Sequence, residues 1–167
     1  MESMLLALRS LLFVFLLPGT IAVLVPFHIL RLTGHWKLPE VALTTLCAGA
    51  VTLLGAAVLL RCVWDFFAAG RGTLAPVDPP KQLVVRGLYR YTRNPMYNGV
   101  LAAILGQAWL FHSTALLAYA AMLWVAFHLF VVLYEERALE TAFGERYRAY
   151  RSAVPRWGFR LPSRIPL

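Results

Sequence analysis

The chain has 167 residues, of which 60% are hydrophobic and 14% charged, and its formal net charge is +8 at pH 7. A soluble domain of this length is nearer half apolar, with about a quarter of its residues charged. Here the charges cluster between long apolar runs, a pattern typical of a polytopic membrane protein and not of a nucleic-acid-binding domain. We therefore predict an all-α membrane helical bundle of about four transmembrane helices, forming one domain over residues 1–167.

The first two predicted spans cover residues 4–30 and 41–69. A bilayer core needs about 20 residues, so residues 4–30 are long enough for one tilted or kinked helix. Two half-helices that meet at Pro18 are the alternative. Cys47 and Cys62 lie in the second span roughly 22 Å apart, too far for a disulfide or a shared metal ion. Residues 71–93 are predicted to form a connector, and connectors of this length are usually functional.

The third and fourth predicted spans cover residues 95–111 and 114–143. Only the tight turn at His112-Ser113 separates them, so we expect an antiparallel helical hairpin. The fourth helix should project beyond the membrane to Phe143, with Gly144 as its C-terminal cap. A short basic amphipathic segment, residues 145–153, follows this cap. Close helix packing is predicted at small residues spaced by four positions, namely Ala48, Thr52 and Ala56, Gly99 and Ala103, and Ala102 and Gly106.

The distribution of Lys and Arg predicts the orientation of the chain. Six of these residues lie between positions 61 and 93 and seven lie from position 137 onward, whereas the opposite side carries only Arg31 and Lys37. Short cytoplasmic loops are enriched in Lys and Arg. We therefore expect a multi-pass integral membrane protein whose connector, termini and active site face the cytoplasm.

Two polar groups should meet where the hairpin opens. Asn94-Pro95 is a helix-start signal, and the first-turn amides together with Arg93 favour an anion or a zwitterion that carries a carboxylate. Glu135 and Glu136 stand at the end of the other helix, and paired carboxylates at a membrane boundary are functional candidates. The alternatives are a capped helix with a positive flank, and glutamates that reach out to water. His128 is expected to be a neutral packing residue.

The motifs around these groups resemble a known superfamily. Residues 87–99 read GLYRYTRNPMYNG, residues 135–139 read EERAL, and residues 143–150 read FGERYRAY. In this order and spacing, over about residues 80–160, the chain is similar to the isoprenylcysteine carboxyl methyltransferase and phospholipid methyltransferase superfamily. Many members of that superfamily have His where this chain has Asn94.

The resemblance implies that the chain is a methyltransferase that uses S-adenosylmethionine. It implies cofactor binding by Arg93, Asn94, Pro95, Tyr97, Glu135 and Glu136, and a C-terminal cytoplasmic lid that includes Tyr147, Tyr150 and Arg151. Arg90 and Tyr91 lie beside this set, and we include both as cofactor-binding candidates. Among all these residues, Arg93, Glu135 and Glu136 are the predicted catalytic residues.

The chemistry of methyl transfer fits these residues. In-line displacement needs aligned reactants and the exclusion of water more than it needs acid–base groups or a metal ion. The sequence predicts neither a catalytic triad nor a metal site. The arginines suit the cofactor carboxylate, a glutamate suits its amino group or ribose hydroxyls, and tyrosines can pack on adenine or face the sulfonium.

The acceptor stays open among a prenylcysteine-type carboxylate, a lipid amine and a thiol, each on a lipophilic molecule among the membrane lipids. The alternative functions are an NADPH-dependent sterol-type reductase and a non-enzymatic helical module. Such reductases typically have an acidic residue where this chain has Val100.

Overall fold

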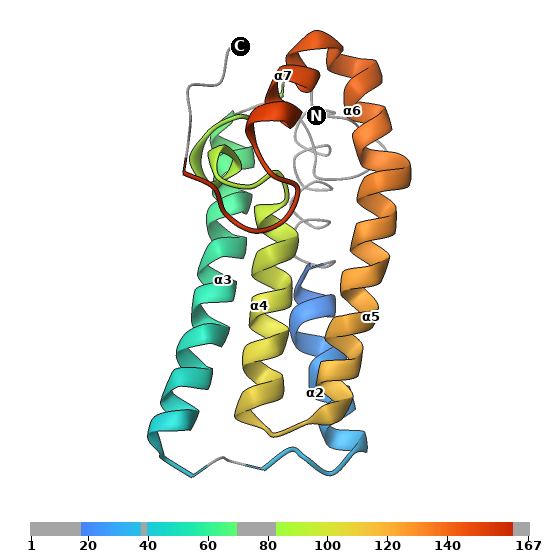
Figure 1. Ribbon diagram of the computed structural model, residues 1–167. Coiled ribbons are helices and arrows are strands. Elements are labelled where there is room, and N and C mark those ends of the chain that lie inside the picture. The colour runs from blue at the N-terminus through green and yellow to red at the C-terminus, as the bar shows by residue number, and fades with distance from the viewer. Residues whose placement is uncertain (1–17, 38–39, 70–82, 162–167) are drawn as a thin grey trace, which may run out of the picture. The chain divides into compact units, whose positions relative to one another are not determined.

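The structure is a computed structural model that describes residues 18–37, 40–69 and 83–161. These residues are mostly helical and include no strand, so the predicted all-α fold is confirmed for this part of the chain. Residues 4–17 of the first predicted span and 71–82 of the predicted connector lie outside the described residues. In chain order the elements are η1 (Thr20–Leu24), α2 (Val25–Leu32), α3 (Leu43–Ala69), η2 (Gly87–Arg90), α4 (Pro95–Leu110), α5 (Thr114–Phe130), η3 (Val131–Glu135), α6 (Glu136–Phe143) and α7 (Glu145–Ala153) (Figure 1).

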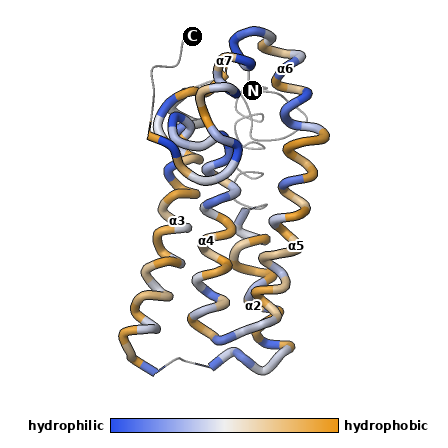
Figure 2. Tube along the Cα trace, viewed as in Figure 1, coloured by the Kyte–Doolittle hydropathy of each residue, from blue (hydrophilic) through white to orange (hydrophobic). Residues whose placement is uncertain are grey.

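Two helical stretches within the described residues are long and apolar enough to cross a membrane. They cover Leu43–Asp65 and Thr114–Phe143, and only 11% and 17% of their most apolar stretches are buried inside the protein. Figure 2 shows the hydrophobic colour continuing along most of α3 and α5. Apolar helices that stay exposed to this extent need an apolar surrounding, which a bilayer supplies. The helix α4 is shorter, at 16 residues.

The described chain falls into two compact units, and α3, α4 and α5 each contribute residues to both. Among the described residues, one unit comprises 18–37, 40–59 and 96–127, and the other comprises 60–69, 83–95 and 128–161. We call them the packing unit and the polar unit.

In the packing unit α3 and α4 approach closely at small residues. A Cβ atom added to Gly55 would lie 2.7 Å from the carbonyl oxygen of Gly99, and one added to Gly106 would lie 2.9 Å from the Cα of Thr52. Small residues let helix backbones approach in this way, and van der Waals contact then holds them together. Thr52, Gly99 and Gly106 were predicted for this role, whereas Gly55 of α3 was not part of the predicted spacing.

Polar side chains of α4 and α5 reach the irregular turn η1 in the same unit. The amide nitrogen of Gln107 donates to the carbonyl oxygen of Ala22 at 2.9 Å, and the Tyr119 hydroxyl donates to that of Ile21 at 3.1 Å. Backbone groups in an apolar surrounding must find partners within the protein. The two side chains therefore satisfy backbone acceptors of a π-helical turn. Ala22 of this turn belongs to a buried core with Val100, Ile104 and Ala120.

The turn between α4 and α5 makes them an antiparallel hairpin, as the sequence predicted. His112 has a positive φ of 48°, and the backbone N–H of Ser113 donates to the carbonyl of Ala108 at 2.9 Å. The Ser113 hydroxyl accepts from the N–H of Leu116 at 3.3 Å and so caps the start of α5. The first helix of the hairpin begins, and the second ends, in the polar unit.

The close approach at Gly55 gives a stability prediction. Gly55→Ala should lower the free energy of unfolding by about 1–3 kcal/mol, because the new methyl group overlaps the backbone of α4. Gly49→Ala is the matched control on the same helix, since no atom lies within 4 Å of its added Cβ atom. It should be neutral or stabilise by up to about 1 kcal/mol through helix propensity. Equilibrium unfolding in mixed micelles measures both, and equal effects would contradict the packing described here.

Candidate active site

The polar unit contains a small pocket at the end of the α5–η3–α6 helix. Its cavity volume is about 20 Å³. That is the room of roughly one water molecule. The lining combines both signs of charge with aromatic and aliphatic walls, and consists of Arg93, Asn94, Val131, Glu135, Glu136, Leu139, Tyr147 and Tyr150.

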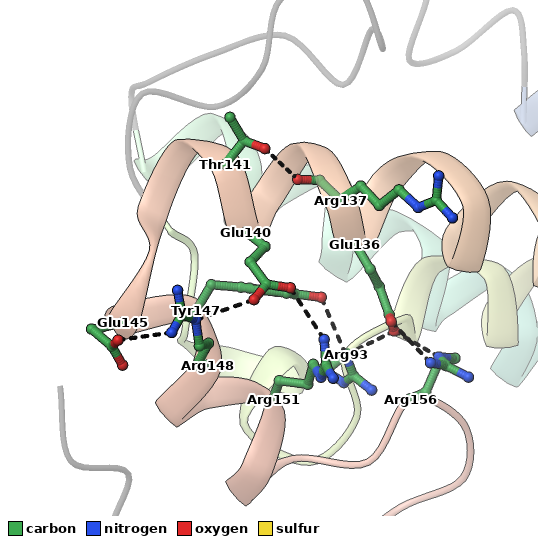
Figure 3. A network of polar contacts seen from close by, with 10 residues as sticks. All are labelled: Arg93, Glu136, Arg137, Glu140, Thr141, Glu145, Tyr147, Arg148, Arg151 and Arg156. Carbon is green, nitrogen blue, oxygen red and sulfur yellow. Dashed lines mark hydrogen bonds and ion pairs between the residues drawn. The ribbon is translucent and has the colours of Figure 1, made fainter.

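The carboxylate of Glu136 is the centre of the pocket's charge network (Figure 3). Its Oε1 accepts from Nη1 of Arg93 at 2.8 Å and from Nε of Arg156 at 2.6 Å, and its Oε2 accepts from Nη2 of Arg156 at 2.9 Å. The side chains of Arg93 and Glu136 are each 10% exposed. Two arginines on one buried carboxylate form a charge-assisted network, and removing one partner from such a network is far more costly than removing one partner from a surface ion pair.

A π-helical turn turns the acidic residues toward this pocket. In η3 the backbone N–H of Glu136 donates to the carbonyl of Val131, five residues earlier. A turn of this kind fits one extra residue into the helix, which brings residue i+5 toward the face of residue i. Val131, Glu135 and Glu136 can therefore line one pocket together, whereas the sequence predicted an uninterrupted α-helix to Phe143.

A segment of the C-terminal tail, residues 154–161, lies along the stretch that leads into α4. We call it the tail segment. The backbone N–H of Arg93 donates to the carbonyl of Pro155 at 2.9 Å, and the side-chain amide of Asn94 donates to the carbonyl of Arg156 at 3.1 Å. The N–H of Arg160 donates to the carbonyl of Tyr91 at 3.0 Å. These bonds hold Arg156 beside Glu136.

The corner between α6 and α7 supplies the aromatic wall. Gly144 has a φ of 51°, a conformation that suits glycine, and it caps α6 as predicted. The helix α7 then buries Tyr147 and Tyr150 in a core with Val154. The Tyr147 hydroxyl accepts from Nη1 of Arg93 at 3.2 Å.

Burial and pairing shift the ionisation of groups around the pocket. Burial is the main effect on the two tyrosines of α7, and it raises the pKa of Tyr147 and of Tyr150 above the usual value for a phenol. Hydrogen bonding to Glu136 raises the pKa of Arg156. At neutral pH the tyrosines are therefore neutral, and Arg156 is a fixed positive charge.

Six of the predicted site residues come together at the pocket, namely Arg93, Asn94, Glu135, Glu136, Tyr147 and Tyr150. The hairpin argument predicted the contact between the arginine before α4 and the glutamates after α5, and the Arg93–Glu136 pair realises it.

The other five predicted residues do not line this pocket. Pro95 is the first residue of α4, and the Arg151 guanidinium pairs with Glu140 at 3.3 Å. Arg90 is exposed, and Tyr91 uses its backbone carbonyl to hold the tail segment. Tyr97 belongs to the packing unit, where its ring stacks on Phe127 at 4.6 Å between centroids.

Three residues at or beside the pocket were not predicted for it. Val131 and Leu139 line it together with Glu135, from which each is four positions away on the helix. Arg156 was counted only as one of the tail's positive charges, and an irregular tail has no period from which its position could be derived. The tail also places the indole N–H of Trp157 3.1 Å from Nδ1 of His128. Within the described part of the chain, no three His, Cys, Asp or Glu residues could together hold a metal ion.

Comparison with known proteins agrees with the motifs. The family model described as phospholipid methyltransferase matches residues 43–146, which reaches further toward the N-terminus than the motifs did. The protein-S-isoprenylcysteine O-methyltransferase B of Arabidopsis thaliana is 28% identical over an alignment of 129 residues, which covers 74% of this chain and 60% of that relative. No solved structure matches the chain. The resemblance predicted from the sequence is therefore confirmed at the level of the family.

The network around Glu136 gives the second prediction. Glu136→Gln leaves two guanidiniums beside a neutral amide, and breaking one side of a buried pair typically costs about 3–5 kcal/mol of folding free energy. Glu140→Gln is the control, because Glu140 pairs with Arg148 and Arg151 at a carboxylate that is 38% exposed. The loss of the Glu140 charge should lower the free energy of unfolding by at most about 1 kcal/mol. Mixed-micelle unfolding compares the two, and a similar cost for both would contradict the central place of Glu136.

Proposed function

The chain belongs to the phospholipid methyltransferase family, and from this premise we propose that it transfers a methyl group from S-adenosylmethionine to a lipophilic acceptor at the cytoplasmic membrane surface. The observation that carries the proposal is a pocket lined by paired charges of opposite sign. Arg93 comes from the motif that leads into α4, and Glu136 comes from the α5–η3–α6 helix. A zwitterionic amino acid group needs such a pair of charges.

The fit of the methyl donor rests on one buried nitrogen. Nε of Arg93 is a buried donor without a hydrogen-bond partner among the described residues. A buried unpaired donor is costly, and each one in a folded protein calls for an explanation. A carboxylate of a bound ligand would satisfy it. We propose that Arg93 holds the cofactor carboxylate, helped by the amides at the start of α4.

The remaining groups of the pocket suit the rest of the cofactor. The carboxylate of Glu135 or Glu136 would bind the amino group or the ribose hydroxyls, and Tyr147 and Tyr150 would form an aromatic wall. When bound, S-adenosylmethionine supplies an electrophilic methyl group on a sulfonium. The chain's own part is to orient the donor and exclude water, which is what an in-line displacement requires.

The size of the cavity indicates that part of the pocket must move. A cavity with room for roughly one water molecule is too small for a cofactor. We propose that the tail segment, which follows the predicted lid residues Tyr147, Tyr150 and Arg151 in the chain, acts as part of this lid and opens at the contact between Arg156 and Glu136. In the closed form Arg156 is paired with the Glu136 carboxylate, which the ammonium group of a cofactor would bind in the open form.

We propose four membrane spans in one domain of residues 1–167, with both ends in the cytoplasm. The support is the pair of long apolar helices and the excess of Lys and Arg on the side of the pocket. The relative's name gives isoprenylcysteine as its acceptor, and the family's name gives phospholipid. The chain spans about 60% of that relative, so for this chain a lipid amine, a prenylcysteine-type carboxylate and a lipophilic thiol are all candidate acceptors.

The third prediction concerns donor binding. Glu135→Gln should weaken S-adenosylmethionine binding about ten- to a hundredfold, because a charge-assisted hydrogen bond is worth about 1.5–3 kcal/mol. Calorimetry on the full chain in detergent measures the dissociation constant. Glu140→Gln is the control and should bind as the unmodified chain does, because its carboxylate pairs with Arg148 and Arg151. Unchanged affinity in Glu135→Gln would remove that residue from the site, and binding of NADPH alone would overturn the methyltransferase proposal.

The fourth prediction tests acceptor and orientation together. S-adenosylmethionine crosses membranes poorly because it is charged, so methyl-labelled cofactor added to sealed vesicles reaches one face only. We expect label in the organic-solvent fraction of inverted vesicles, whose cytoplasmic face is outside, and little label with right-side-out vesicles. Vesicles without the protein set the background. Label confined to water-soluble products would contradict a lipophilic acceptor, and label in right-side-out vesicles alone would reverse the orientation.

A further inference from the structure

A buried carboxylate in the polar unit has no part in the proposed function. Asp65 lies near the end of α3, is 3% exposed, and is the single acidic residue between Glu40 and Asp78 in the sequence. An acidic side chain on an otherwise apolar helix is costly to bury, so its retention calls for a reason. The visible ion partner is Arg61 at 3.3 Å, whose side chain is 58% exposed. A half-exposed pair one helical turn apart contributes too little to supply that reason.

Asp65 is packed against the first residue of η2. A Cβ atom added to Gly87 would overlap the Oδ2 atom of Asp65 and would lie 3.1 Å from its Cγ atom. Gly87 also has a φ of 56°, which residues with a side chain rarely adopt. The guanidinium of Arg86 donates to the backbone carbonyl of Asp65 at 3.2 Å. One end of the η2 turn is thus fitted to both the side chain and the backbone of Asp65.

The other end of the same short turn is tied to the pocket. The Tyr150 hydroxyl donates to the backbone carbonyl of Tyr89 at 2.8 Å, and Tyr150 lines the pocket. Within the turn, the N–H groups of Tyr91 and Thr92 both donate to the carbonyl of Leu88. Arg93 follows directly. A shift at Gly87 would therefore be passed on to Tyr150 and Arg93 through the hydrogen-bonded turn of four residues.

We propose that Asp65 is a positioning residue for the pocket. Its carboxylate is the surface on which Gly87 rests, and through the η2 turn it sets the places of Tyr150 and Arg93. The choice of S-adenosylmethionine as the probe rests on the proposed function, whereas the positioning itself does not. A helix-stabilising ion pair with Arg61 would predict no effect on the pocket.

The test compares Asp65→Ala, Gly87→Ala and the double variant, as the full chain in detergent, by calorimetry with S-adenosylmethionine. Each single variant should raise the dissociation constant about tenfold, which equals about 1.4 kcal/mol, with the number of sites per chain unchanged. The double variant should raise the dissociation constant by no more than about tenfold, because both changes disrupt the same contact. Gly34→Ala is the matched control, since Gly34 has a φ of 71° and no atom within 4 Å of an added Cβ atom.

Binding data of this kind separate positioning from stability. A purely stabilising role would lower the number of sites per chain at an unchanged dissociation constant, because it would only reduce the folded fraction. That result, or unchanged binding in both single variants, would overturn the proposal. Should Asp65→Ala fail to fold, Gly87→Ala tests the same contact from the other side.

Amide hydrogen exchange provides a readout that needs no ligand. Asp65→Ala and Gly87→Ala should speed exchange of the amides of residues 88–93 at least about tenfold, because local opening of the turn becomes easier. Gly34→Ala should leave these amides unchanged. If the unmodified chain binds no S-adenosylmethionine, the proposed donor is wrong, but the exchange result still decides on Asp65. Unchanged exchange at residues 88–93 in both variants would overturn the positioning role.

Discussion

The carboxylate of Glu136 is the group on which the polar unit depends. It binds Arg93, 43 residues earlier, and Arg156, 20 residues later. A buried carboxylate must be paired, and each guanidinium that pairs with it brings its own segment along. Arg93 brings the stretch that leads into α4, and Arg156 brings the tail segment. The backbone bonds between these two segments then close a ring of contacts around one charge.

The irregular backbone of this unit follows from the same requirement. A regular α-helix turns successive residues about 100° apart, so Glu135 and Glu136 would face different directions. The π turn at Val131–Glu135 reduces that difference at a point where the helix leaves its apolar stretch. Gly144 then allows α7 to fold back and bury its tyrosines beside Arg93. Local departures from ideal geometry thus gather charge of both signs at one small cavity.

The sequence predicted those features of the site that short connections determine. A turn of a few residues between α4 and α5 forces the hairpin, and the hairpin brings Arg93 near Glu136 whatever the rest of the chain does. Arg156 and Asp65 could not be predicted in the same way. Arg156 lies in a tail without periodicity, and no local sequence pattern brings Asp65 to Gly87, which lies 22 positions later in the chain. The close approach at Gly55 was not predicted, because Gly55 stands outside the four-residue spacing of Ala48, Thr52 and Ala56.

The closed pocket and the proposed donor can be reconciled by an exchange of charges. Opening the tail segment without a ligand would expose a carboxylate that has lost one of its two partners, which is costly in a buried site. A ligand ammonium that takes the place of the Arg156 guanidinium restores the pairing, so one charge-assisted contact replaces another at small net cost. The released guanidinium is already 32% exposed and can be hydrated. On the proposed function, the pocket would open only in the presence of a molecule that carries the charge it needs, and the unpaired Nε of Arg93 would favour one that also carries a carboxylate.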